Sequence, residues 1–160
     1  MNFELSNGVI SLLVKVTQYC RDPFISKDLG QKFANAINFC VDQLTTQKGL
    51  KFKIADPQRF KFEPKQLLAN LICMYANMGV EQSFKEFVVS DGRSYSDETF
   101  AKAVKIISDQ KRGINVGQEE HEKFCALVAE LQELSKAHEK NDVSAALTTN
   151  LGIASIRRCS

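Results

Sequence analysis

One pair of side chains in this sequence has the types and the spacing of a catalytic pair. His121 and Cys125 stand four residues apart in a stretch of helical periodicity, so both would lie on one helix face, where an imidazole can serve as the base for a thiol nucleophile. No third residue that would orient the imidazole is evident, and Cys125 borders an apolar face beside Phe124. We therefore expect an ordinary, partly buried thiol and no catalytic residue in this chain.

The same stretch comes close to a zinc-binding pattern. Residues 121–125, HEKFC, match the metalloprotease pattern HExxH except that Cys125 replaces the second histidine, and no third ligand follows. The cysteines are far apart and form no CxxC pair, as is typical of proteins in a reducing cytosol or nucleus: Cys20, Cys40, Cys73, Cys125 and Cys159. We expect no metal ion and no other cofactor.

Basic residues and phenylalanines interleave between residues 48 and 65. Residues 50–54 alternate strictly between apolar side chains and lysine, which predicts one extended connection. Such a segment can bind single-stranded nucleic acid, but an edge with solvated lysines outside and phenylalanines inside is the commoner arrangement. The formal net charge of the whole chain is only +2, and we expect no nucleic-acid partner.

Residues 90–100, SDGRSYSDETF, carry more polar chemistry than a connection between helices needs. Asp91 and Gly92 form a turn, Ser94 or Ser96 caps the next helix, and Asp97 and Glu98 are two acids at that helix start. Arg93 and Tyr95 remain. We predict that the Arg93 guanidinium forks onto a carboxylate or onto helix-end carbonyls from the neighbouring repeat, with the Tyr95 ring packed beneath it. The alternative is that this loop contacts a partner.

The elements that would position these residues are helices. Apolar residues at helical spacing predict about six of them, over residues 8–20, 26–44, 64–78, 84–88, 100–112 and 118–137. Ser6 or Asn7 is placed to cap the first, and Gly113 to end the fifth in a left-handed conformation. Short joins between them favour an all-α stack, with residues 1–137 as one helical core and residues 138–160 as a flexible or marginally helical tail.

Length and composition agree with a single core. A chain of 160 residues buries enough surface for one domain, and 44% hydrophobic with 25% charged residues is ordinary for a globular protein. The N-terminal apolar run lacks a basic start and is far shorter than the roughly 20 residues of a membrane span. We expect no signal peptide and no membrane association.

Three stretches, residues 22–44, 60–79 and 84–100, carry a resemblance to a known family. Phenylalanine and proline-lysine precede a leucine pair, a tyrosine-x-asparagine pair closes the helix, and DGRSYS follows. The matching residues are Phe62, Pro64, Lys65, Leu67, Leu68, Tyr75, Asn77, Asp91, Gly92, Arg93, Ser94, Tyr95 and Ser96. Their order and spacing resemble the C-terminal part of the core of the U-box ubiquitin conjugation factors, the "E-four" class of chain-elongation ligases, over roughly residues 8–137.

The resemblance implies a fold, a function and partners. The fold would be the last helices of an armadillo-like α-solenoid, and the parent protein would elongate polyubiquitin chains on substrates for proteasomal degradation in the cytoplasm and nucleus. Its partners would be the ubiquitin-conjugation machinery, ubiquitinated substrates and an AAA unfoldase. Asp91, Arg93 and Tyr95 are the candidates for a structural clasp or a partner contact, and the other matching residues are structural.

Two departures from the family pattern shape the hypotheses. The tail after His138 has neither the length nor the aspartate-proline of the U-box that docks the conjugating enzyme, so we expect this chain alone to be inactive and to serve as a scaffold. The alternative is a non-catalytic adaptor that competes for partners of the intact ligase. The face that carries Val9, Ile10 and Leu13 would also lack a covering repeat, which predicts self-association.

Overall fold

The computed structural model describes residues 3–46, 63–109, 111 and 113–156. Within them the chain forms seven α-helices and no strand, which confirms the predicted all-α class. The helices are α1 (Phe3–Tyr19), α2 (Asp22–Ile25), α3 (Lys27–Thr45), α5 (Pro64–Met78), α6 (Gln82–Val89), α7 (Asp97–Ser108) and α8 (Gln118–Ile156). The predicted extended segment, residues 50–54, and Phe62 lie outside the described residues.

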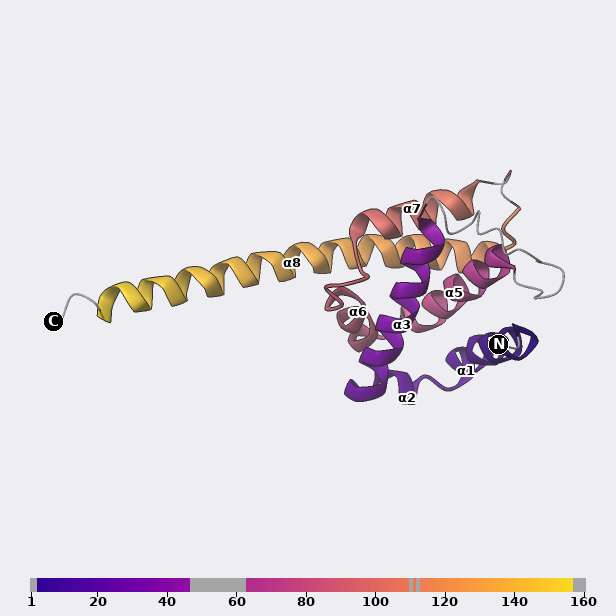
Figure 1. Ribbon diagram of the computed structural model, residues 1–160, viewed down its shortest axis with the longest axis horizontal. Helices are drawn as coiled ribbons and strands as arrows, with labels where there is room; N and C mark the ends of the chain where they lie inside the picture. The colour runs from indigo at the N-terminus through magenta and orange to yellow at the C-terminus, as the bar shows by residue number, and fades with distance from the viewer. Residues whose placement is uncertain (1–2, 47–62, 110, 112, 157–160) are drawn as a thin grey trace.

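The helices stack around α5. Figure 1 shows α5 between α1 on one side and α8 on the other, and α5 packs against both. Helix α3 packs across α6 and α7, and the short α2 joins it to α1. No helix of the described ranges is long and apolar enough to cross a membrane.

Four fully buried aromatic side chains form the centre of the core. Tyr75 of α5 lies with its ring centroid 5.9 Å from that of Phe84, 5.4 Å from that of Phe100 and 5.8 Å from that of Phe124. These three phenylalanines come from α6, α7 and α8. The tilted and edge-on ring geometry is the arrangement that aromatic pairs prefer, so Tyr75 joins four helices at one point.

Helix α5 begins at Pro64, as the sequence predicts. Proline fits the first helical position because a backbone N–H at that position would have no hydrogen-bond partner within the helix. The pattern predicted an amphipathic helix, but eight of the 15 residues of α5 are buried. The reason is that α1 and α8 cover it from two sides. Lys65, the second residue of α5, is exposed.

Helix α3 confirms most of the predicted apolar stripe of residues 26–44, although Leu29 and Ala36 of that stripe are exposed. It buries Ala34, Ile37, Val41 and Leu44 on one side. A Cβ atom at Gly30 would lie 2.4 Å from the carbonyl oxygen of Phe24 and 2.6 Å from the ring of Phe87. The missing side chain at this position therefore permits the close approach of α2 and α6 to α3.

Several helix ends differ from the predicted ones. Helix α1 begins at Phe3, before the predicted caps, and α2 forms where the sequence indicated only a break, because Pro23 suits a helix start. Helix α7 ends at Ser108 instead of reaching residue 112. Gly113 does adopt a left-handed conformation, with a φ of 64°, but it lies in the connection beyond the helix.

Helix α8 continues to Ile156, although the apolar pattern ends at Ala137. Its far half projects from the stack in Figure 1. Backbone hydrogen bonds within a helix need no apolar stripe, and the stripe is required only where a helix packs against neighbours. The end of the pattern therefore marks the end of packing and not the end of the helix.

Candidate functional site

The loop between α6 and α7 is fastened to the core by buried polar side chains. Asp91 is only 6% exposed, and one of its carboxylate oxygens, Oδ2, accepts a hydrogen bond of 3.1 Å from the side-chain amide of Asn38. The same amide donates to the carbonyl oxygen of Val88 at 3.1 Å, and the Tyr75 hydroxyl donates to Asn38 Oδ1 at 2.5 Å. We call Asn38, Tyr75 and Asp91 the clasp.

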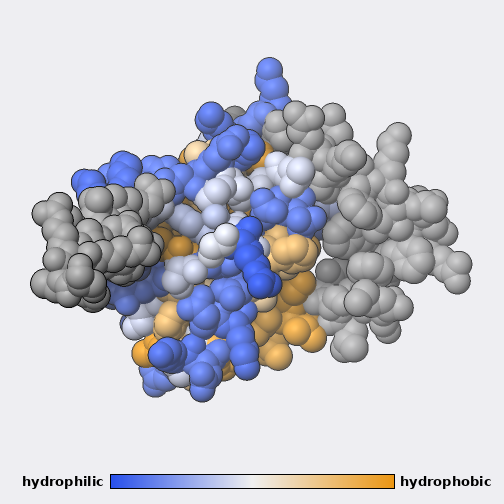
Figure 2. Space-filling model, turned by 60° about the vertical axis from the view of Figure 1, so that its left-hand side comes forward, coloured by the Kyte–Doolittle hydropathy of each residue, from blue (hydrophilic) through white to orange (hydrophobic). Residues whose placement is uncertain are grey.

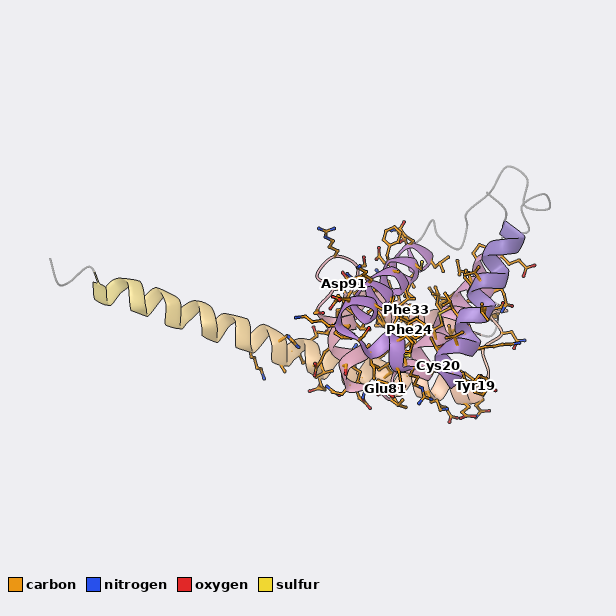
Figure 3. The ribbon with its side chains drawn as sticks, turned by 90° about the horizontal axis from the view of Figure 1, so that it is seen from below. Tyr19, Cys20, Phe24, Phe33, Glu81 and Asp91 are labelled. Carbon is orange, nitrogen blue, oxygen red and sulfur yellow. The ribbon has the colours of Figure 1, made fainter. Side chains whose placement is uncertain are left out.

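The second oxygen of Asp91 orders the loop itself. Asp91 Oδ1 accepts from the backbone amides of Arg93 at 3.2 Å and Ser94 at 3.4 Å, the pattern of an aspartate-centred turn. The carboxylate thus receives three donors. Burial raises the pKa of Tyr75 well above its ordinary value of 10.0, so its phenol keeps the proton that it donates to Asn38. In Figure 3, Asp91 lies on the side of α3 that faces away from α1.

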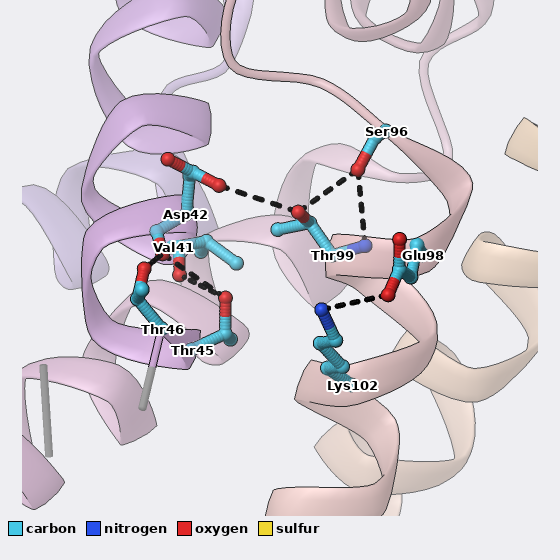
Figure 4. A network of polar contacts seen from close by, with 8 residues as sticks. All are labelled: Val41, Asp42, Thr45, Thr46, Ser96, Glu98, Thr99 and Lys102. Carbon is cyan, nitrogen blue, oxygen red and sulfur yellow. Dashed lines mark hydrogen bonds and ion pairs between the residues drawn. The ribbon is translucent and has the colours of Figure 1, made fainter. Parts of the chain in front are cut away.

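Further polar contacts fix the ends of α6 and α7 along α3. Gln31 donates to the Phe87 carbonyl at 3.1 Å and accepts from the Ser90 hydroxyl at 3.1 Å. At the other end, the Thr99 hydroxyl donates to Asp42 Oδ1 at 3.3 Å (Figure 4). Helix α3 therefore holds the chain on both sides of the clasp.

Ser96 caps α7, as one of the two predicted serines. Its hydroxyl oxygen accepts from the Thr99 backbone amide at 3.1 Å. Asp97 and Glu98 occupy the first turn of α7, where the positive end of the helix dipole stabilises their negative charges. Lys102 pairs with Glu98 at 2.8 Å one turn later, and Figure 4 shows the cap and this ion pair together.

Tyr95 packs beside the clasp, but not beneath an arginine. Its ring centroid lies 5.1 Å from that of Phe100, and its hydroxyl donates to Asp97 Oδ1 at 2.7 Å. Burial and this hydrogen bond raise the pKa of Tyr95. Arg93 is exposed, and within the described ranges no carboxylate or carbonyl oxygen bonds its guanidinium. The predicted fork of Arg93 therefore does not form within the described ranges.

The tyrosine-x-asparagine pair binds two different helices. Tyr75 reaches α3 through the clasp, whereas the Asn77 amide donates to the Val14 carbonyl at 3.1 Å and to the Thr17 hydroxyl at 3.3 Å, both on α1. Leu68 is fully buried and Leu67 is partly buried in the core. A Cβ atom at Gly92 would meet nothing within 4 Å, so this glycine is not required for space.

The His121 and Cys125 side chains do meet, without the geometry of a catalytic pair. Cys125 Sγ lies 3.9 Å from Nδ1 and 4.0 Å from Nε2 of His121, so the sulfur is in line with neither nitrogen. His121 Nε2 instead lies 3.0 Å from the Ser108 hydroxyl. Burial raises the pKa of the Cys125 thiol, which keeps it protonated. No group of three or more potential metal ligands gathers in the part of the chain that the structure describes.

Comparison with known proteins identifies the family of this chain. The family model described as "Ubiquitin elongating factor core" matches residues 1–132. The chain belongs to this family. Tyr75 and Asp91, two residues on which the sequence resemblance to the ubiquitin elongating factor core rested, are both clasp residues.

Curated relatives of the ubiquitin elongating factor core carry related names. "Ubiquitin conjugation factor E4 A" of Pongo abelii is 31% identical over 103 residues, 64% of this chain and 10% of the relative. "E4 ubiquitin-protein ligase UFD2" of Saccharomyces cerevisiae is 30% identical over 120 residues, 75% of this chain and 12% of the relative. "Ubiquitin conjugation factor E4" of Schizosaccharomyces pombe is 28% identical over 142 residues, 88% of this chain and 14% of the relative. This chain thus spans about a tenth of their length.

Sequence reasoning missed Asn38, the centre of the clasp. It lies in the apolar stripe of α3, beside Ile37 and one turn before Val41, and it is fully buried. A polar residue on the buried side of an amphipathic helix needs buried partners. That signal was present in the sequence, but the partners come from α5 and from the α6–α7 loop, 37 and 53 residues away.

Proposed function

We propose that this chain is a scaffold segment of a ubiquitin chain-elongation ligase. In this role it positions substrate, partner and a catalytic U-box, and it does not itself transfer ubiquitin. The observation that carries the proposal is the match of residues 1–132 to the ubiquitin elongating factor core. The clasp gives further support, since it joins α3, α5 and the α6–α7 loop in one fixed arrangement, as a scaffold requires.

The proposal includes the partners and the cellular context. The names of the relatives, ubiquitin conjugation factors and an E4 ubiquitin-protein ligase, support contact with the ubiquitin-conjugation machinery and with ubiquitinated substrates. An AAA unfoldase as partner, proteasomal degradation as outcome, and a cytoplasmic and nuclear location follow from the same resemblance. No residue of this chain is assigned to the unfoldase.

A reconstituted ubiquitination reaction tests the scaffold role. Activating enzyme, conjugating enzyme, ubiquitin and a ubiquitin-fused substrate are incubated with this chain alone and beside an intact chain-elongation ligase. We expect no chain extension by this chain alone. Extension without the intact ligase would contradict the scaffold role, whereas inhibition of the intact ligase would identify the competing adaptor instead.

Within this proposal, Arg93 is the partner contact of the α6–α7 loop. Its side chain is exposed, and the loop beneath it is held rigid by Asp91. An exposed guanidinium on an ordered loop loses little conformational entropy when it binds a carboxylate.

The test is an Arg93→Ala variant beside a Lys32→Ala control, which removes an exposed cation from α3. Both variants should keep the wild-type Tm, because neither side chain is buried. Titration with ubiquitin and with an isolated U-box should show weaker binding for Arg93→Ala only. A Tm several degrees lower for Arg93→Ala would assign the residue to the fold, and equal binding by both variants would remove it as a contact.

A further inference from the structure

Asp91 and Gly92 are the one aspartate-glycine pair of the sequence. In such a pair the backbone nitrogen of the glycine can attack the side-chain carboxyl carbon of the aspartate, because glycine has no Cβ atom to hinder the approach. A nitrogen–carbon bond forms, and the carboxyl hydroxyl leaves as water with the amide proton. One water molecule then opens the resulting succinimide at its main-chain carbonyl. The product is isoaspartate, in which the chain runs through the aspartate Cβ atom.

Three hydrogen bonds hold the Asp91 carboxylate in one orientation. Asp91 is buried, and its Oδ2 accepts from the Asn38 side-chain amide at 3.1 Å. Its Oδ1 accepts from the backbone amides of Arg93 at 3.2 Å and Ser94 at 3.4 Å. These bonds must break before the carboxyl carbon can rotate freely toward the Gly92 nitrogen.

The peptide bond between Asp91 and Gly92 is held as well. The Gly92 amide donates to the Ser90 carbonyl oxygen at 3.0 Å, so the nitrogen that would attack is engaged. The Asp91 amide donates to the Val88 carbonyl oxygen at 3.4 Å, and the Asp91 carbonyl oxygen accepts from the Tyr95 amide at 3.2 Å. The attack therefore needs a local opening of the α6–α7 loop, in which both the carboxylate and the peptide are released.

We propose that Asp91 and Gly92 form a latent isoaspartate site, and that Asn38 protects it by keeping the α6–α7 loop closed. A Cβ atom built on Gly92 would meet nothing within 4 Å, so the space beside this residue is open. Gly92 and Arg93 are exposed, and hydrophilic side chains cover much of the surface in Figure 2. Water, the second reactant, therefore has access to the opened loop, and neither step needs an enzyme.

Isomerisation would release the clasp permanently. The main chain would gain one methylene group between residues 91 and 92, and the carboxylate would be attached directly to the Cα atom of residue 91. The Asn38 amide and the backbone amides of Arg93 and Ser94 would then lose their acceptor. This chemistry does not depend on the proposed ubiquitin function, so either can fail without the other.

The hydrogen bonds of the carboxylate set the expected rates. When the loop opens and closes faster than it reacts, the rate of isomerisation is proportional to the open fraction. Three hydrogen bonds must break, so the folded chain should react on the order of 100-fold more slowly than the unfolded chain. Asn38→Ala removes one of the three and should raise the rate about tenfold, which corresponds to about 1.4 kcal/mol for a buried hydrogen bond to a charged group.

Incubation in heavy-oxygen water at neutral pH, followed by peptide mapping, tests the site. Each passage through the succinimide adds one heavy oxygen atom to residue 91, and mass spectrometry of the peptide that contains it gives the rate. The folded wild type is compared with the wild type in guanidinium chloride and with Asn38→Ala. The matched control is Asn77→Ala, which makes the same chemical change and removes two hydrogen bonds to α1 without touching the clasp. It should react at the wild-type rate, under conditions where circular dichroism shows each variant folded.

A second substitution identifies the attacking nitrogen. Gly92→Ala in the Asn38→Ala background should slow the reaction again, because the added Cβ atom hinders the attack and meets no other part of the fold. Equal rates for Asn38→Ala and Asn77→Ala would overturn the protection by Asn38. Equal rates for the folded and the unfolded wild type, or no effect of Gly92→Ala, would overturn the site itself.

Discussion

The strongest test of the fold is the removal of the Asn38 side chain. Asn38→Ala deletes two donated hydrogen bonds, to Val88 and Asp91, and the one accepted from Tyr75. Each buried hydrogen bond contributes roughly 1 kcal/mol net, so the free energy of unfolding should fall by about 3 kcal/mol. For a chain of this size that loss lowers the Tm by roughly 6–12 °C and leaves most molecules folded.

The matched control is Asn35→Ala, one turn earlier on α3. Asn35 is exposed, and its carbonyl accepts one surface hydrogen bond of 2.8 Å from Gln31. This variant should lie within about 0.5 kcal/mol of the wild type. Urea unfolding followed by circular dichroism gives both values on one scale. If Asn38→Ala loses no more stability than Asn35→Ala, the clasp does not stabilise the fold.

A double-mutant cycle isolates the contact between the Tyr75 hydroxyl and Asn38. Tyr75→Phe removes only that hydroxyl, and the double variant with Asn38→Ala counts the shared hydrogen bond once. The double variant should therefore be more stable than the sum of the single losses predicts, by about 1 kcal/mol. Strict additivity would show that the two side chains act independently.

Three further predictions concern backbone space, pH and thiol reactivity. Gly30→Ala should destabilise the protein, since its Cβ would lie 2.4 Å from a backbone oxygen, while Gly92→Ala, which meets open space, should leave the urea midpoint unchanged. Folding favours the protonated form of Tyr75, because its pKa is raised in the folded state, so stability from this source is full at neutral pH and should decline as the pH rises beyond about 10. Iodoacetamide at pH 8 should label exposed Cys20 faster than Cys125, because burial raises the pKa of the Cys125 thiol. Peptide mass mapping measures both rates, and faster labelling of Cys125 would indicate an activated thiol.

The sequence predicted helix starts well where an apolar stripe of the helix packs against the core. Helix α3 and helix α5 begin within one residue of the predicted starts, because an apolar period and a proline mark them. The predicted end of α7 was wrong, and α8 continues beyond its apolar pattern, because a helix needs an apolar stripe only where it packs against neighbours. The Ser96 cap was predicted from local chemistry, as one of two serines, and the structure confirms it.

The candidate site was predicted only in part. Asp91 and Tyr95 were expected to form a clasp, and both are held by described hydrogen bonds. Arg93 was assigned the central contact, because a guanidinium is the usual partner of a carboxylate. The structure leaves Arg93 exposed and instead binds the Asp91 carboxylate to Asn38, which was not predicted, because 53 residues separate the two in the chain.

By itself, the sequence determined the all-α class, the starts of α3, α5 and α8, the turn chemistry of residues 90–96 and the family to which the chain belongs. These depend on residues that are close together in the chain, whose spacing sets which side of a helix is apolar and which amides are capped. Only the tertiary structure decided that Asn38 and Tyr75 hold Asp91, and that α1 and α8 cover α5 from two sides. Both outcomes depend on which helices meet in space, and a buried polar group is satisfied by whatever the packing brings within hydrogen-bond distance.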